Sequence, residues 1–342
     1  MKLNEIKLKP LLNTLKLEDI DDSVYFSKRY SGYVSNSRLS LINPKQGGTP
    51  EKYFEGLSNN KIYSDSLIFG SAVHELVLQP ESFELIDTVN RPTAKCGFIA
   101  DLVYKSKSVD PSDDVLLEAS KEINYYKGDL SDNQLETLRN KILPYLKSRQ
   151  TFELSNKGTK TPIYLDQKSR DRLASCLASL QNNNKIVDLL HPKDILGEDL
   201  LSKNERTILL DLEASAPDHD PIIIKLKSKL DNFTIDKDQN IITVNDVKTT
   251  GKRVNEFNNA IEDYHYYREM GMYSYLLSLC ANKYWDMKSP TIKSNFLVVS
   301  TIPKFYTKVV PMTKKLFYKG FNEFSALVKL VAYYLFKGYT YK

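Results

Sequence analysis

Two carboxylates and one lysine are the residues of this sequence best suited to chemistry. Asp231 closes one run of alternating apolar residues, Asp246 lies near the end of the next run, and Lys248 follows two residues later. Residues two apart on a strand share a face, so Asp246 and Lys248 should point the same way. If the two strands pair, Asp231 meets Asp246 at one end of a hairpin. Such a group suits a hard divalent cation beside a proton carrier or charge stabiliser.

The stretch 226–250 has to form that hairpin. Apolar residues alternate through Ile222, Ile224 and Leu226, which is the period of a strand. The polar cluster 236–240 (DKDQN) predicts a turn, and the apolar residues of 241–247 predict the second strand. An exposed hairpin with charged ends is the simpler explanation of this stretch taken alone.

Composition limits the class of protein. The 342 residues are 41% hydrophobic and 27% charged, which is typical of a folded globular chain. The net charge of +5 is compatible with nucleic acid as a partner but does not require it. No run reaches the roughly 18 apolar residues of a membrane span, so we expect no membrane segment.

Cysteine usage points to a reducing compartment. Cys96, Cys176 and Cys280 are far apart and no C-x-x-C pair occurs, so neither a zinc site nor an iron–sulfur cluster is indicated. The N-terminal residues lack the unbroken apolar core of a signal peptide. We therefore expect a cytoplasmic protein.

One histidine lies in a predicted helix. Residues 66–78 have the spacing of an amphipathic helix that ends before Pro80, and Gly70 and Ser71 allow a close approach to it. His74 lies in its middle among apolar residues. A lone histidine in such a place is more often a core residue with a satisfied hydrogen bond than a ligand.

Two segments carry a family resemblance. Residues 69–84 (FGSAVHELVLQPESFE) resemble the G-x-x-x-H-x-x-x-L-x-P-x-x-F signature of exodeoxyribonuclease VIII-type phage and prophage recombination exonucleases. The D-(x)14-D-x-K spacing of Asp231, Asp246 and Lys248 resembles the PD-(D/E)xK nuclease superfamily, to which those enzymes belong. The two motifs occur in the order that the family has.

Three further segments extend the resemblance. Residues 35–39 (SNSRL) are similar to the family's opening S-x-S-x-L segment. Glu205 matches by position a glutamate that opens the strand before the metal hairpin. Tyr266, Glu269 and Tyr273 are similar to a Y-x-x-Q-x-x-x-Y motif, with glutamate where the family usually has glutamine. An ionised glutamate cannot donate a hydrogen bond, so the role of position 269 stays open.

The resemblance implies a metal site and a catalytic set. His74, Asp231, Asp246 and the carbonyl of Val247 would hold one or two Mg²⁺ ions, for which Mn²⁺ could substitute. Lys248 would orient or deprotonate the attacking water or stabilise charge. Glu205 would be an additional or supporting carboxylate, or an ordinary charge at a strand end. The predicted catalytic set is Lys248, Asp231, Asp246, Glu205 and Glu269.

DNA contacts are predicted at four places. Lys225, Lys227 and Lys229 share one face of a strand, which usually means a solvated face but could lie along a phosphate backbone. Tyr266 and Tyr273 share a helix face and could equally pack on the sheet. The predicted DNA-binding residues are Arg29, Ser35, Ser37 and Arg38 as a 5′-phosphate pocket, with Lys229, Lys252, Arg253, Tyr266 and Tyr273.

The expected fold is α/β (α+β), with a PD-(D/E)xK restriction-endonuclease-like core in the order αβββαβ. A central mixed sheet is flanked by helices and carries helical insertions. We expect one nuclease domain over 1–342, with N-terminal helices and the histidine motif in 31–85, a variable helical insertion in 87–160, the catalytic core in 161–310 and a C-terminal helix in 311–342. Single helices are predicted over 161–190 and 254–281, and a short one near 11–17.

The resemblance implies a metal-dependent exonuclease that digests duplex DNA ends from 5′ to 3′ and leaves 3′ single strands for recombination. It also implies a closed homo-oligomeric ring and a single-strand annealing recombinase as partner. A structure-specific or nicking endonuclease of the same superfamily is an alternative. A non-catalytic DNA-binding module on a decayed nuclease core is another.

Overall fold

The computed structural model describes residues 1–55, 63–126, 128, 130–156, 158–193 and 200–341. The chain forms two compact units. The sheet unit comprises residues 1–60 and 180–342, and the helical unit comprises residues 61–179. The segment 87–160, predicted as an insertion, falls entirely within the helical unit.

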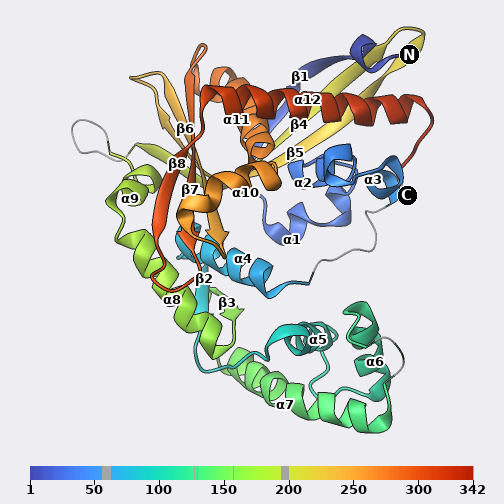
Figure 1. The fold of residues 1–342 in the computed structure, drawn as a ribbon, viewed down its shortest axis with the longest axis vertical. Helices are drawn as coiled ribbons and strands as arrows, with labels where there is room; N and C mark the ends of the chain where they lie inside the picture. The colour runs from blue at the N-terminus through green and yellow to red at the C-terminus, as the bar shows by residue number, and fades with distance from the viewer. Residues whose placement is uncertain (56–62, 127, 129, 157, 194–199, 342) are drawn as a thin grey trace. The chain divides into compact units, whose positions relative to one another are not determined.

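The sheet unit is built on six strands in the order β1-β4-β5-β6-β7-β8 (Figure 1). All neighbouring strands are antiparallel except β6 and β7, which are parallel. The strands are β1 (Lys7–Glu18), β4 (Leu201–Ala216), β5 (His219–Asp236), β6 (Ile241–Thr250), β7 (Thr291–Ser300) and β8 (Thr307–Pro311).

Helices join the two parallel strands, because a parallel pair needs a crossover connection. After β6 the chain forms η4 (Val254–Glu256), α10 (Phe257–Asp263) and α11 (Tyr266–Trp285) before it enters β7. The order of three strands, helices and a fourth strand agrees with the predicted order. A central, mostly antiparallel mixed sheet flanked by helices is confirmed.

Two long helices cover one face of this sheet. Helix α11 packs against β1 and β7, and α12 (Lys314–Phe336) packs against α11 and β5 (Figure 1). The helices approach closely at Gly320, where an added Cβ would collide with the carbonyl of Tyr267. Side chains of α11, α12 and the inner strands form the core, including Leu276, Leu277, Phe296, Phe324 and Val328.

Short helices complete the sheet unit. Val34 forms a bridge with Leu226 of β5, and α2 (Asn36–Ser40) begins two residues later with Ser35 as its N-cap. The remaining helical segments are η1 (Leu3–Glu5), α1 (Asp22–Tyr25), η2 (Lys28–Tyr30), η3 (Pro44–Gln46), α3 (Pro50–Glu55) and α9 (Asn184–Leu190).

The helical unit has its own core around a two-stranded parallel pair, β2 (Phe83–Ile86) and β3 (Thr161–Tyr164). Its buried residues include Ile99, Leu116, Leu138 and Ile142. The helices are α4 (Asp65–Leu78), α5 (Ala94–Lys105), α6 (Asp113–Glu122), α7 (Asp132–Ser155) and α8 (Gln167–Gln181), most of which belongs to this unit. Within the described residues, no helix of the chain has both the length and the apolar character needed to span a bilayer.

Several predicted elements are wrong in detail. Residues 11–17 lie in strand β1 instead of a short helix, because pairing with β4 overrides the local leucine spacing. Pro10 is tolerated there since β1 is an edge strand. The predicted helix 161–190 is a strand and two helices, and the predicted helix 254–281 breaks at His265, whose φ is 55°.

Candidate active site at the end of the β5–β6 hairpin

The β5–β6 hairpin brings Asp231 and Asp246 together. Asn232 pairs with Asn245 at the last step of the ladder, so the next residues on the two strands are these aspartates. There the strands separate, and Asp231 Oδ2 accepts a hydrogen bond of 2.8 Å from the backbone N–H of Val247. Because the N–H and C=O of a strand residue project to the same side, the Val247 carbonyl faces the same gap.

Where β6 leaves β5, another segment takes its place along the free edge. The Val34 N–H donates to the Lys225 carbonyl at 2.7 Å, and the Val34 carbonyl accepts from the Lys227 N–H at 2.9 Å. Ser35 Oγ accepts from the N–H of Arg38 and lies 3.0 Å from Ser37 Oγ. The start of α2 is thereby fixed beside β5.

Lys248 is held between two carboxylates. Its Nζ lies 2.8 Å from Asp246 Oδ2 and 3.1 Å from Glu269 Oε2. It also lies 4.9 Å from the centre of the Tyr266 ring. The Tyr273 hydroxyl donates to Glu269 Oε1 at 3.0 Å, which fixes the second oxygen of that carboxylate. Strand β6 and helix α11 therefore supply one connected group.

Burial sets the charge state of this group. Asp246 is 1% exposed, and desolvation raises its pKa well above the ordinary range, against the attraction of Lys248 and reinforced by Asp231 and Glu269. Burial alone would lower the pKa of Lys248, but the nearby carboxylates of Asp246, Glu269 and Asp231 outweigh it and raise the pKa well above its usual value.

Asp246 lacks the hydrogen bonds that normally accompany a buried carboxylate. Its Oδ2 contacts the Lys248 ammonium group, and among the residues that the structure describes no other hydrogen-bond donor reaches either oxygen. A buried carboxylate with so few donors is unfavourable unless a cation compensates it. The site therefore fits a hard cation that prefers oxygen ligands.

Glu205 extends the acidic row to a third strand. Its neighbours on β4 pair with Asn232 and Leu230, which places Glu205 opposite Asp231. One carboxylate oxygen of Glu205 lies within 4.8 Å of one of Asp231. The backbone of Glu205 has a φ of 52°, in the left-handed region that non-glycine residues rarely adopt. Such strain in mid-strand is typical of functional sites.

The opposite face of the sheet carries an asparagine row that the sequence analysis missed. Asn232 Nδ2 donates to Asn204 at 2.7 Å, Asn245 Nδ2 to Asn232 at 2.8 Å, and Asn295 Nδ2 to Asn245 at 3.0 Å. Asn232 and Asn245 are fully buried and each adjoins one of the aspartates. This row fixes the strand register from which the acidic residues project. The sequence carries a signal for this row, because an asparagine adjoins each aspartate of the hairpin, Asn232 beside Asp231 and Asn245 beside Asp246.

Of the three lysines predicted to share a face of β5, Lys225 is exposed, whereas Lys227 and Lys229 are covered. Lys227 is 8% exposed, and its Nζ donates to the Tyr25 carbonyl at 2.7 Å. Lys229 Nζ lies 2.5 Å from Asp22 and 3.1 Å from Glu205, so two carboxylates engage it. Long-range packing of residues 22–30 on β5 covers these two lysines. Lys229 is thus placed to hold Glu205 instead of facing a DNA backbone.

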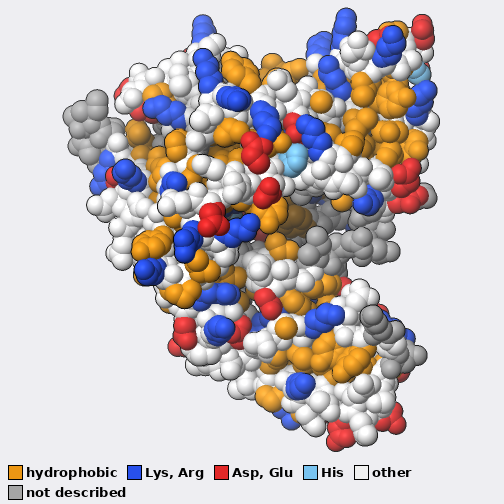
Figure 2. Space-filling view, viewed as in Figure 1, with side chains coloured by type: hydrophobic (Ala, Val, Ile, Leu, Met, Phe, Trp, Pro, Cys, Tyr) orange, Lys and Arg blue, Asp and Glu red, His pale blue; other side chains and the backbone are white. Residues whose placement is uncertain are grey.

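The other residues predicted to bind DNA differ in exposure, and Ser35 and Tyr266 are partly buried. The Arg38 guanidinium is buried between the rings of Tyr53 and Tyr341 and donates to the carbonyls of Ser31 and Tyr33. Tyr273 is buried as well. The exposed ones are Arg29, Ser37, Lys252 and Arg253. Figure 2 shows Lys and Arg side chains dispersed among Asp and Glu on the visible face, without a single basic stripe.

His74 lies on α4 of the helical unit. It is partly exposed, whereas its neighbours Ala72 and Val73 are buried. The structure thus differs from a fully enclosed core histidine. Its predicted role as a metal ligand depends on the sequence motif.

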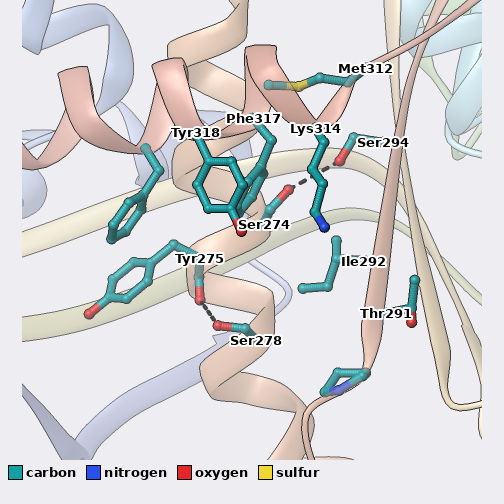
Figure 3. Close-up of a pocket in the computed structure, with 12 residues that line it drawn as sticks. Ser274, Tyr275, Ser278, Thr291, Ile292, Ser294, Met312, Lys314, Phe317 and Tyr318 are labelled. Atoms are coloured by element: carbon teal, nitrogen blue, oxygen red, sulfur yellow. Dashed lines mark hydrogen bonds between the residues drawn. The ribbon is translucent and has the colours of Figure 1, made fainter.

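A separate cavity of about 720 Å³ lies between α11, β7 and α12 (Figure 3). Ser274 and Ser294 meet at 3.1 Å on its floor, and Tyr275 and Tyr318 contribute aromatic rings. Among the described residues of its lining, Lys314 is the one charged side chain and none is a carboxylate. The cavity therefore lacks the ligands of a metal site.

Comparisons with known proteins gave few matches. No family model matches the chain, and no curated protein matches it. A solved structure of a provisionally assigned exonuclease from Eubacterium rectale is similar over 92% of this chain and 86% of its own, with a TM-score of 0.46 and 9% identity. A Vibrio cholerae protein is similar over 82% of this chain and 59% of its own, with a TM-score of 0.15 and 10% identity. Since both TM-scores lie below 0.5, neither similarity is evidence for the function of this chain.

Proposed function

We propose that this chain is a metal-dependent deoxyribonuclease of the PD-(D/E)xK type that hydrolyses phosphodiester bonds at duplex DNA ends. One observation carries the proposal. Asp246 is buried opposite Asp231, with Lys248 held between it and Glu269 and no other donor described at its oxygens. The motifs of the sequence add the substrate class.

Oxygen ligands for the metal come from neighbouring strands. Asp231, Asp246 and the carbonyl of Val247 would hold one or two Mg²⁺ ions, and Mn²⁺ could substitute. Glu205 lies close enough to Asp231 to join them. His74 would complete the set, on the sequence motif alone. When bound, the metal supplies charge stabilisation and a more acidic water.

The side chains of the site have distinct tasks. Lys248 Nζ lies between the carboxylates of Asp246 and Glu269, so we assign it stabilisation of negative charge on the attacked phosphate. Glu269 positions Lys248, and Tyr273 positions Glu269. In this arrangement Glu269 holds the Lys248 ammonium group through an ion pair. A neutral glutamine at position 269 would hold it less strongly.

The sequence resemblance extends the proposal to the direction of digestion, the cellular setting and the partners. We propose digestion from 5′ to 3′ that leaves 3′ single strands for recombination, in a cytoplasmic setting such as a phage-infected bacterium. A closed ring of identical chains and a single-strand annealing recombinase would accompany this activity.

The test is digestion of linear duplex DNA labelled at either the 5′ or the 3′ end. Wild type and Asp246→Asn are compared in Mg²⁺, in Mn²⁺ and in EDTA, with Asp238→Asn in the exposed β5–β6 turn as matched control. We expect metal-dependent release of 5′-labelled nucleotides by wild type and the control only. Closed circular DNA should stay intact.

Other outcomes identify the alternatives. Cutting of closed circles would replace the exonuclease by an endonuclease of the same superfamily. DNA binding without cleavage in either metal would replace it by a non-catalytic module. His74→Ala then tests the ligand set separately, because loss of a ligand should raise the metal concentration needed for half-maximal rate, whereas a merely structural histidine should not change it.

A further inference from the structure

A second pocket of about 420 Å³ lies beyond the carboxyl ends of β6 and β7. Its walls come from two turns. The turn after β6 contributes Arg253 and Asn255, and the turn between β7 and β8 contributes Ile302, Lys304 and Tyr306. Ser300, the last residue of β7, forms part of the lining.

The pocket is close to the candidate active site along the strands. In the parallel ladder Lys248 pairs with Val298, and Thr250 pairs with Ser300. The wall at Ser300 is therefore two residues beyond Lys248, roughly 7 Å along the strand direction.

The lining combines positive charge with exposed apolar surface. Arg253 and Lys304 are exposed cations, and none of the lining residues is a carboxylate. The Tyr306 side chain is 61% exposed and Ile302 is 37% exposed. Cations that follow a phosphate backbone beside an aromatic ring on which a base stacks are the usual means of binding a single nucleic-acid strand.

Hydrogen bonds hold the pocket in shape. The N–H of Thr301 donates to the Thr250 carbonyl at 2.8 Å, and Ser300 Oγ donates to the Lys252 carbonyl at 2.9 Å. The N–H of Ser300 donates to the Tyr306 carbonyl at 2.9 Å. Lys304 and Phe305 have φ values of 83° and 44°, so two consecutive non-glycine residues adopt left-handed backbone conformations. Such strain is maintained only where the surroundings fix it.

We propose that this pocket receives one nucleotide of the strand being cut, with its base stacked on Tyr306 and its phosphate contacted by Arg253 and Lys304. This inference depends on the proposed nuclease function for the identity of the strand. The pocket would fix the register of the strand and thereby place the neighbouring phosphate at Lys248.

The first test is binding of a fluorescein-labelled single-stranded oligonucleotide in EDTA, measured by anisotropy. Tyr306→Ala should weaken binding by about 5- to 20-fold, since it removes one stacking platform. Tyr306→Phe should bind as wild type does, because stacking needs the ring and not the hydroxyl. The matched control is Tyr318→Ala, at a tyrosine 54% exposed on α12, which should leave affinity unchanged.

Charge is tested in the same assay. Arg253→Gln with Lys304→Gln should weaken binding and reduce its salt dependence, while Lys237→Gln in the β5–β6 turn should do neither. Equal losses for Tyr306→Ala and Tyr318→Ala, or no loss for either, would overturn the inference.

The second test determines whether the pocket binds a nucleotide of the cut strand during cleavage. Linear duplexes carry one abasic site at successive positions from the cut end, and single-turnover cleavage is measured. Wild type should be slowed at one position, and Tyr306→Ala should show no further slowing there because its stacking contact is already lost. Uniform behaviour of wild type at all positions would overturn the nucleotide pocket. Absence of all cleavage by wild type would instead reject the nuclease function, and the binding contrast would still decide the pocket.

Discussion

Two buried ionic clusters begin at neighbouring residues of α11. Arg268 belongs to a closed cluster with Glu323, His265 and Tyr267, and Glu269 belongs to an open cluster with Asp231, Asp246 and Lys248. In the closed cluster each nitrogen of the Arg268 guanidinium has an acceptor, supplied by Asn36, Ser40, Gln46 and Glu323. In the open cluster the oxygens of Asp246 have Lys248 alone among the described residues.

The number of hydrogen-bond partners of the buried charge distinguishes a structural cluster from one suited to chemistry. A buried charge with all of its hydrogen bonds can lock helices together, as Arg268 does for α2, α11 and α12. A buried carboxylate short of donors destabilises the folded chain, and a cation would relieve that deficit. Glu269 and Arg268 thus show that proximity in sequence does not decide function, whereas the balance of charge and donors does.

The largest expected effect comes from the open cluster. Asp246→Asn keeps the volume of the side chain but removes the charge that a cation needs. We expect the rate of DNA cleavage to fall by about 1,000-fold or more, with the fold retained. Release of labelled nucleotides measures the rate, and circular dichroism checks the fold. Retention of more than about a tenth of the wild-type rate would contradict the assignment.

The closed cluster should respond in stability instead. Arg268→Met leaves Glu323 buried without its main cation, so the free energy of unfolding should fall by about 3 kcal/mol in urea titrations. Adding Glu323→Gln should restore part of that loss, because the unpaired charge is then removed. A loss of stability near zero for Arg268→Met would mean that the cluster is not what locks the helices.

Glu269→Gln tests whether Glu269 positions Lys248 in the open cluster. A glutamine still accepts from Tyr273 but attracts Lys248 less, so the ammonium group is held less firmly. We expect about a tenfold lower cleavage rate with unchanged stability. Single-turnover kinetics measures this. A rate at or above that of wild type would show that position 269 does not position Lys248.

A third buried charge, Lys227, provides a test that depends on pH. Burial, followed by the repulsion of Arg38, lowers its pKa from 10.5 to about 8. Between about pH 8 and 10.5 the unfolded chain therefore binds more protons than the folded one, so the stability contributed by this group rises with pH.

Lys227→Met removes that dependence. We compare the free energy of unfolding of the variant with that of wild type at each pH. The advantage of the variant should be about 1 kcal/mol larger at pH 7 than at pH 9.5. Urea titrations at both pH values measure it. A difference that is independent of pH would mean that Lys227 is not desolvated.

Local patterns predicted the hairpin and the placement of its acidic residues. Alternating apolar residues and the turn at 237–240 were sufficient to put Asp231 opposite Asp246, because strand period and turn position together fix the register. The helix predicted over 66–78 and the C-terminal helix predicted in 311–342 are found as α4 (Asp65–Leu78) and α12 (Lys314–Phe336).

Long-range contacts account for what the sequence did not reveal. The leucines of β1 fit a helix until pairing with β4 is known, and nothing local marks the break at His265. Lys227 and Lys229 of β5 are polar in sequence but are covered by residues 22–30. The Lys248–Glu269 ion pair joins residues far apart in the chain, so a motif could place Glu269 but not state what it holds.

The most direct test of the open cluster is the melting temperature of wild type, Asp246→Asn and Glu323→Gln with and without Mn²⁺. Without metal, Asp246→Asn should melt close to wild type, because an amide costs less to bury than a carboxylate and Lys248 keeps Glu269 as a partner, and Glu323→Gln should melt below wild type. Mn²⁺ should raise the melting temperature of wild type and Glu323→Gln but not that of Asp246→Asn. An equal Mn²⁺ shift for all three proteins, or none for wild type, would contradict a cation site at Asp246.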